Sequence, residues 1–104
     1  MTNPGESAAV RYLNALRDGP LTFGALLRSI RQTDDHTIAG FAKRLGTSRA
    51  HLSEVENGRR LVSAARAARW ARAVGYPEAI FVKLALQAQL DAAGLKLRVD
   101  VTAA

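Results

Sequence analysis

The sequence predicts an all-α protein, a bundle of about five to six helices followed by one short β-strand. Apolar residues recur every three or four positions through most of the chain, which is the spacing of one helix face. Ser or Thr precedes most of these segments and Gly follows them, as at the ends of helices. Strict alternation of apolar and charged residues, the pattern of a strand, occurs only at residues 95–101.

Two helices are expected in the first third of the chain. Ser7 can cap the first, which covers residues 7–18 and ends at a Gly-Pro pair. The second covers residues 22–32, and its apolar residues fall at helical spacing: Phe23, Leu26, Leu27 and Ile30. Residues 33–36 form a loop.

Two short helices follow, separated by a tight turn. Thr37 caps the first, which Gly46 ends. Thr47 or Ser48 caps the second, which runs to Asn57 and is stopped by the glycine that follows.

Two longer helices complete the bundle. Ser63 caps a helix that runs through Val74. Pro77 opens the last and longest helix, which extends to about Ala93 with Gly94 as its C-cap.

The turn between the two short helices has the features of a helix-turn-helix. Ala42 is small, which lets two helices cross at a steep angle with their backbones close together. Gly46 can adopt the left-handed conformation that a three-residue turn requires. An ordinary helical hairpin is the alternative.

The second short helix keeps one face free. Leu52 and Val55 point toward the core. The opposite side carries Ala50, Ser53, Glu54 and Asn57, with Arg49 on the flank, so most of its groups are short and few are charged. Such a face fits a groove as wide as a helix, and the major groove of B-DNA is about 12 Å wide. The pattern therefore favours a helix that reads DNA.

The charge balance indicates a polyanionic partner. Fifteen Lys and Arg against nine Asp and Glu give a net charge of +6 and a pI near 10.8. Net charge alone does not separate nucleic acid from a membrane surface. No stretch approaches the roughly 20 apolar residues of a membrane span, and the N-terminus lacks the pattern of a signal peptide. We therefore expect a soluble, cytoplasmic protein without a membrane partner.

The composition excludes several kinds of site. The chain has no cysteine, which rules out disulfides and thiolate metal sites. Its two histidines, His36 and His51, cannot form a zinc site alone. The sequence contains no evident catalytic triad, phosphate-binding glycine loop or metal cluster. We therefore expect no enzyme activity, no cofactor and no small-molecule ligand.

Four motifs carry a family resemblance. In chain order they are L-R-x-I-R, F-A-K-R-L-G-T-S, E-N-G-R-R and A-x-A-V-G. The part of the chain that contains them resembles the Xre family, the lambda-repressor-like helix-turn-helix proteins. The resemblance implies a DNA-binding domain at residues 22–76. It leaves an N-terminal extension at residues 1–21, with one helix, and a C-terminal helix and strand at residues 77–104.

The resemblance also implies which side chains face the bases: Ser48, Arg49, Ala50, Ser53 and Glu54. Arg49 can donate two hydrogen bonds to one guanine. Glu54 can accept a hydrogen bond from cytosine, or it can orient a neighbouring cation instead.

Contacts with the DNA backbone are implied for four residues: Thr37, Asn57, Arg59 and Arg60. Thr37 stands at a helix N-terminus, where free backbone N–H groups favour a phosphate. A solvated basic turn is the alternative for the other three. His51 can reach a phosphate, but an exposed surface histidine is the commoner case.

Other matched positions concern the architecture. Arg31 and Glu56 correspond to a partly buried ion pair of the family, and we assign both to structure because removing one would strand the other charge. Trp70 falls at a core position. The chain departs from the family where His36 replaces a core leucine and where Ile38 replaces a polar residue that reaches a phosphate.

The predicted C-terminal strand has no partner in a helical domain, and an unpaired edge is a liability. The same strand from a second copy would give an antiparallel ribbon across a two-fold axis. Its dimerisation residues would be the apolar ones: Leu95, Leu97, Val99 and Val101. A disordered tail is the alternative.

These observations favour a sequence-specific transcriptional regulator that binds double-stranded DNA. The main hypothesis is a repressor that binds a near-palindromic operator as a homodimer. An antitoxin that binds a toxin protein and represses its own promoter is the alternative. A protein-interaction module without DNA binding is a third, which the cations of the second short helix and its following turn argue against.

Overall fold

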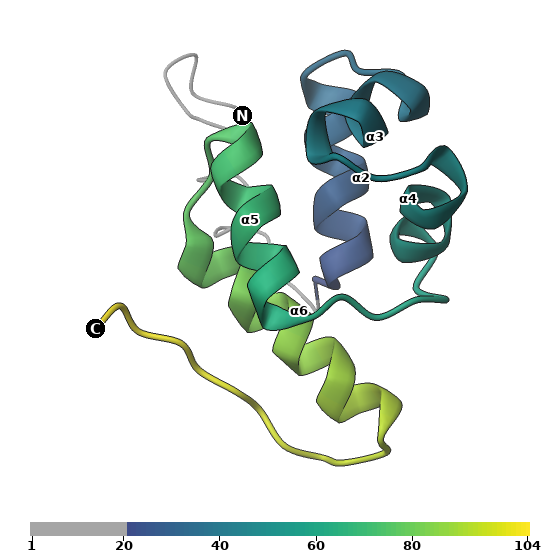
Figure 1. Cartoon of the computed structure of the whole chain (residues 1–104). Helices are drawn as coiled ribbons and strands as arrows, with labels where there is room; N and C mark the ends of the chain where they lie inside the picture. Colours follow the sequence, from purple (N-terminus) through teal and green to yellow (C-terminus); the bar gives the residue numbers. More distant parts are fainter. Residues whose placement is uncertain (1–20) are drawn as a thin grey trace, which may run out of the picture.

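The computed structural model describes residues 21–104, and the helix expected at residues 7–18 lies outside them. Figure 1 shows the described part as a bundle of helices that ends in an extended C-terminal segment. The helices are α2 Phe23–Thr33, α3 Ile38–Leu45, α4 Arg49–Glu56, α5 Ala64–Val74 and α6 Glu78–Ala92. The all-α bundle that the sequence predicts is confirmed.

Side-chain caps fix where the helices begin. In four of them the cap hydroxyl accepts a hydrogen bond from the backbone N–H three residues later, which satisfies one of the free donors of the first turn. The capping residues are Thr22, Thr37, Ser48 and Ser63. α6 begins after Pro77 without such a bond.

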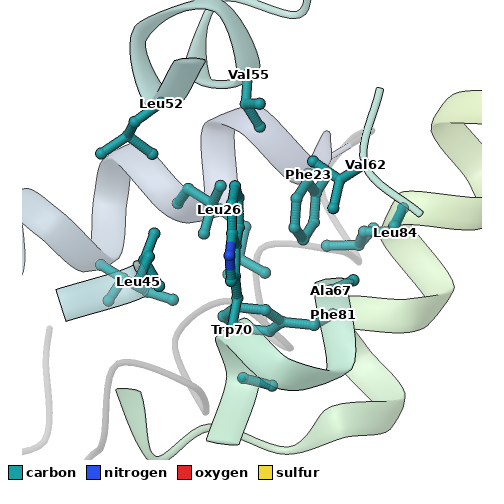
Figure 2. Packing of buried hydrophobic residues seen from close by; sticks show 14 of the residues in the cluster. Phe23, Leu26, Leu45, Leu52, Val55, Val62, Ala67, Trp70, Phe81 and Leu84 are labelled. Carbon is teal, nitrogen blue, oxygen red and sulfur yellow. The ribbon is translucent and has the colours of Figure 1, made fainter. Parts of the chain in front are cut away.

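The core is built around three aromatic rings from α2, α5 and α6. Phe23 stacks on Trp70 with ring centroids 6.3 Å apart and meets Phe81 edge-on at 5.8 Å. Figure 2 shows Leu52 and Val55 of α4 directed toward the same cluster. Because Trp70 is buried among these residues, its expected role in packing is confirmed.

α6 packs against α5 and α2 and contributes Phe81 and Leu84 to the shared core. The last helix is therefore part of the same packed unit as the four helices before it. Within residues 21–104, no helix combines the length and the apolar character that crossing a membrane requires.

The strand predicted at residues 95–101 is not formed in the single chain. This segment runs in extended form beside α6 (Figure 1), and the described residues contain no strand. A strand requires a second backbone as its partner. The Gln87 side chain occupies that position instead, since it donates a hydrogen bond to the Leu97 carbonyl and accepts one from the Val99 N–H.

Candidate nucleic-acid interface

The turn between α3 and α4 consists of three residues, Gly46, Thr47 and Ser48. Gly46 has φ 76° and ψ 34°, the left-handed conformation that the sequence requires there. The Thr47 N–H donates to the Ala42 carbonyl over 2.9 Å and closes the end of α3. Ser48 then caps α4 by accepting from the His51 N–H over 3.0 Å. The chain therefore changes direction within three residues, and hydrogen bonds close the end of α3 and cap the start of α4.

α4 is buried along one side only. Leu52 and Val55 are almost fully inaccessible to solvent, whereas Arg49 and Ala50 are exposed and Ser53 is half-exposed. α2 and α3 both pack on the buried side. The residues expected to face DNA bases therefore lie on or beside the exposed side of α4, and α2 and α3 pack against its opposite side.

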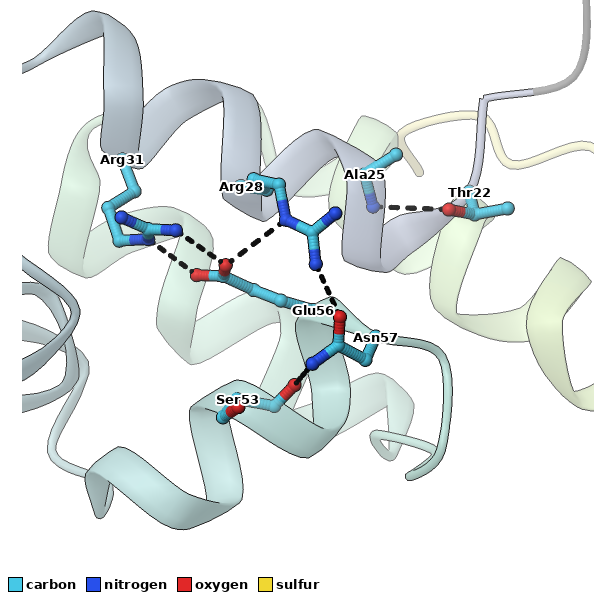
Figure 3. Close-up of polar contacts among 7 residues, drawn as sticks. All are labelled: Thr22, Ala25, Arg28, Arg31, Ser53, Glu56 and Asn57. Carbon is cyan, nitrogen blue, oxygen red and sulfur yellow. Dashed lines mark hydrogen bonds and ion pairs between the residues drawn. The ribbon is translucent and has the colours of Figure 1, made fainter.

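An ion pair behind α4 sets its position against α2. Arg31 donates two hydrogen bonds to the Glu56 carboxylate, over 2.8 and 3.0 Å, and Figure 3 shows the two groups facing each other. Glu56 is only 5% exposed. Arg28 lies 3.6 Å from the same carboxylate, so two guanidinium groups of α2 hold the last residue of α4. The hydrogen bonds with Glu56 raise the pKa of Arg31 above its usual value, so the guanidinium stays charged.

Gly24 allows α2 to approach the end of α4 closely. A side chain at this position would place its Cβ 2.6 Å from the Glu56 carbonyl oxygen, and closer still to that of Val55. Because real Cβ atoms do not come so near a backbone oxygen, only glycine fits without a shift of one helix. The backbone contact and the ion pair lie at the same end of α4.

Two cations at this surface have no partner in the described part of the chain. Arg49, at the first turn of α4, and Arg59, in the turn after it, are exposed and make no side-chain hydrogen bond or ion pair within residues 21–104. An unpaired guanidinium presents all five of its N–H donors to a ligand. These two residues therefore leave positive charge unneutralised next to the open face of α4.

Glu54 and Arg60 hold each other on the open side of α4. The Arg60 Nε lies 2.6 Å from a Glu54 carboxylate oxygen, and both side chains are about half-exposed. This contact matches the alternative expectation for Glu54, the orientation of a neighbouring cation. The carboxylate retains further acceptor capacity, because an ionised carboxylate has about four lone-pair sites.

Asn57 ends α4 and connects it to α2. Its Nδ2 donates to the Ser53 carbonyl over 2.9 Å, and its Oδ1 accepts a hydrogen bond from Arg28. Both ends of the carboxamide therefore have partners within the protein (Figure 3). One N–H of the amide remains to contact a ligand.

One comparison with known proteins gives a match. The family model described as a helix-turn-helix domain matches residues 22–80, more than half of the chain. The chain belongs to the helix-turn-helix domain family. No curated protein and no solved structure matches it.

Helix-turn-helix domains bind DNA. The family match therefore makes the protein a DNA-binding regulator. The matched range contains α2, α3, α4, α5 and the first residues of α6. It therefore includes the open face of α4, the turn before it and the basic turn after it. In this family the second helix of the motif is the one that enters the major groove.

His51 differs from the expectation of an exposed surface histidine. Its side chain is half-buried in the helix-turn-helix domain, with the ring edge against Trp70 at a centroid distance of 6.0 Å. Nδ1 is 2.9 Å from the Thr47 hydroxyl, while Nε2 is buried and has no hydrogen-bond partner. The physical reason is that the ring covers the aromatic core, where it buries more surface than it would on the outer side of α4.

Burial is the main reason why the pKa of His51 lies below its usual value. The positive charges of Arg66 and Arg60 lower it further, and the Glu54 carboxylate acts in the opposite direction. The ring is therefore neutral at physiological pH, and its position does not offer a charge to a phosphate.

At the start of α3, Thr37 is exposed and its hydroxyl oxygen accepts from the Gly40 N–H over 3.0 Å. The hydroxyl hydrogen is left to donate, as a phosphate contact requires. Ile38 is half-buried against the core, which explains why this position carries no polar group. His36 packs against Phe41 at a centroid distance of 5.5 Å, at the position where the resemblance to the Xre family implies a leucine.

Gly24 and Arg28 were not expected to matter for this surface, yet they position α4. A glycine inside an apolar helical repeat can indicate a close approach of another backbone, because alanine would otherwise be favoured at that position. Arg28 stands three residues before Arg31, on the same helix face, which is a usable signal for a shared acidic partner.

Proposed function

We propose that the protein is a sequence-specific transcriptional repressor that binds a near-palindromic operator as a homodimer, with α4 as the recognition helix. The observation that supports this most directly is the exposed, unpaired Arg49 on the open face of α4. Its guanidinium can donate two parallel hydrogen bonds to O6 and N7 of a guanine, a contact that discriminates by about 1–3 kcal/mol.

The neighbouring residues of α4 complete a base-reading surface. Ser48 and Ser53 are small hydroxyl donors, and Ala50 is small enough to contact a thymine methyl group. Glu54 can accept from the amino group of cytosine while it still pairs with Arg60. All of these side chains lie on or beside the side of α4 that the other helices leave open.

Contacts with phosphates would fix the helix in the groove. Thr37 can donate from its hydroxyl at the start of α3. Asn57 lies at the C-terminal end of α4, and Arg59 and Arg60 lie in the turn that follows it. Phosphate contacts at two separated points orient a protein on the duplex without reading sequence. A homodimer would place two copies of α4 about 34 Å apart, one helical turn of DNA, and occlude a promoter that overlaps the operator.

The test is fluorescence anisotropy with the DNA upstream of the protein's own gene and with a scrambled version of it, over a series of salt concentrations. We expect the wild type to prefer the upstream DNA by roughly 10³-fold. The Arg49→Ala variant should lose about 10-fold or more of that preference, because a bidentate base contact is removed.

Arg72→Ala is the matched control. It removes the same charge from α5, where Arg72 pairs with Glu78 and contacts neither α4 nor the C-terminal segment. It should leave the preference unchanged. If Arg49→Ala weakens binding to both DNAs equally, Arg49 contacts phosphate only, and α4 does not read bases through it.

A further inference from the structure

The C-terminal segment has one hydrogen-bonded edge. The Gln87 Nε2 donates to the Leu97 carbonyl over 2.8 Å, and the Gln87 Oε1 accepts from the Val99 N–H over 2.9 Å. A residue of a neighbouring parallel strand would make the same two bonds through its backbone. Gln87 also donates to Asp91 over 2.9 Å, which holds the carboxamide in this orientation. The inner edge of the segment is therefore occupied.

The outer edge has no such partner. In an extended chain, backbone groups of successive residues alternate in direction, so those of Lys96, Arg98 and Asp100 point away from Gln87. Within residues 21–104 these backbone N–H and C=O groups make no hydrogen bond. The segment also carries exposed leucines, Leu95 at 48% and Leu97 at 57%. An unpaired edge beside exposed apolar side chains is a template for another strand.

We propose that this outer edge pairs with the same edge of a second copy of the chain, antiparallel, with the two-fold axis at Val99. The role of this dimer rests on the proposed function, whereas the pairing itself can be tested without DNA. Backbone groups of residue 98 would bond with those of residue 100 of the second copy, and the reverse pair would form on the other side of the axis.

Charge complementarity selects this register. With the axis at Val99, Arg98 lies opposite Asp100 of the second copy, so two pairs of opposite charge form across the ribbon. An axis at Arg98 would pair Lys96 with Asp100 but would also place two arginines opposite each other, and an axis at Leu97 would place Arg98 opposite Lys96. Like charges directly opposite are destabilising.

The apolar residues agree with the same register. Leu97 would lie opposite Val101 of the second copy, and Val99 opposite Val99, all on one face of the ribbon. Two isolated strands are marginally stable. Here each strand is fixed to its own α6 by Gln87 and by the contact of Lys83 with Asp100 at 3.4 Å. In the dimer, the two C-terminal segments would lie side by side, with α6 of each copy on the outer side of its own segment. The C-terminal segment is already extended in the single chain.

The first test is disulfide formation, and the chain contains no cysteine that would compete. Val99→Cys should give a covalent dimer in oxidised glutathione, because Cα atoms of a non-hydrogen-bonded antiparallel pair lie about 4.5 Å apart, within the range of a disulfide. Arg98→Cys is the matched control. Its two copies would be offset by two residues along the strands, more than about 7 Å apart, and should cross-link at least ~10-fold more slowly.

The second test is a charge exchange read by sedimentation equilibrium of the full chain. Arg98→Asp alone and Asp100→Arg alone each place like charges opposite each other and should lower the dimer fraction. An equimolar mixture of the two variants restores both pairs, because one chain then carries two aspartates and the other two arginines. The mixture should form a heterodimer with a higher affinity than the homodimer of either variant.

Equal cross-linking of the Val99→Cys and Arg98→Cys variants, or a mixture that stays as weak as its components, would overturn the proposed pairing. Neither experiment contains DNA. A protein that dimerises as described but does not prefer its upstream DNA therefore contradicts only the proposed function. A protein that prefers that DNA but does not pair through this edge contradicts only this inference.

Discussion

Arg31 on α2 and Glu56 at the end of α4 face each other through two hydrogen bonds, over 2.8 and 3.0 Å, with the carboxylate almost fully buried. The two residues are 25 positions apart in the chain. The pair connects the first helix of the DNA-binding region to the helix proposed to read bases. The orientation of α4 and the stability of the domain therefore depend on the same contact.

Removing the Glu56 charge should destabilise the domain strongly. Glu56→Gln leaves the Arg31 guanidinium without an opposite charge in a buried site, and we expect the free energy of unfolding to fall by about 3 kcal/mol. The matched control is Glu78→Gln, which breaks the exposed pair with Arg72 and should cost about 1 kcal/mol or less. Urea unfolding monitored by circular dichroism measures both. Equal losses would mean that burial does not determine the strength of the Glu56 pair.

Gly24→Ala should destabilise the domain although alanine favours helices. The added methyl group meets the carbonyl oxygens of Val55 and Glu56, so α2 and α4 must separate. We expect a loss of about 1–3 kcal/mol, as for other overpacked sites. In Gly40→Ala, the nearest atom is the Thr37 cap hydroxyl at 3.1 Å, a single side-chain oxygen that needs to shift by only a few tenths of an ångström, and stability should rise by about 0.5–1 kcal/mol. Thermal melts of the two variants should therefore shift in opposite directions, and a rise in both would contradict the close approach at Gly24.

Local chemistry made much of the fold predictable. The caps at Thr37, Ser48 and Ser63 and the left-handed Gly46 depend on residues within one turn of each other, so the sequence alone indicates where these helices begin and end. The inward positions of α4 follow from the 3.6-residue period. These features predict the open face of α4 without any knowledge of long-range contacts.

Contacts between distant segments were not predictable in the same way. The inward orientation of His51 depends on Trp70, 19 positions later by their numbers, and the need for a glycine at residue 24 depends on where the end of α4 passes. Gln87 was not expected to take the place of a strand, because the alternation at residues 95–101 indicates an extended segment but not what lies beside it. The hydrophobic pattern specifies which face of a segment is apolar, but it does not specify which other segment packs against that face.

The stability of the domain should fall between pH 7 and pH 5 through His51. The pKa of His51 is lower in the folded state than its usual value of about 6.5, so below that pH the unfolded chain binds a proton more readily than the folded chain does. The stability that comes from the neutral His51 ring is fully present above about pH 7. It is lost as the pH falls toward the lower pKa of the folded state, at about 1.4 kcal/mol for each pH unit by which folding lowers this pKa.

Urea unfolding at pH 7.5 and pH 5.5 tests this dependence. The His51→Gln variant should show a smaller loss of stability than the wild type, because the titrating ring is absent. His36→Gln is the matched control, since it keeps His51 and should keep the full loss. The same pH dependence in wild type and His51→Gln would assign the effect to other groups.

Glu54→Gln separates the two roles that Glu54 can have. The carboxylate now pairs with Arg60 at 2.6 Å, and its negative charge opposes phosphate binding nearby. If Glu54 only orients Arg60, the variant should bind upstream and scrambled DNA more tightly by the same factor, with a steeper dependence on salt. If Glu54 also accepts from a cytosine, the preference for upstream DNA should fall by about 1–3 kcal/mol while binding to scrambled DNA still tightens.

Arg60→Gln provides the reference, since loss of a phosphate contact weakens binding to both DNAs and lowers the salt slope by about one. We expect the second result for Glu54→Gln, because the carboxylate lies on the open side of α4 and retains acceptor capacity beyond its bond with Arg60.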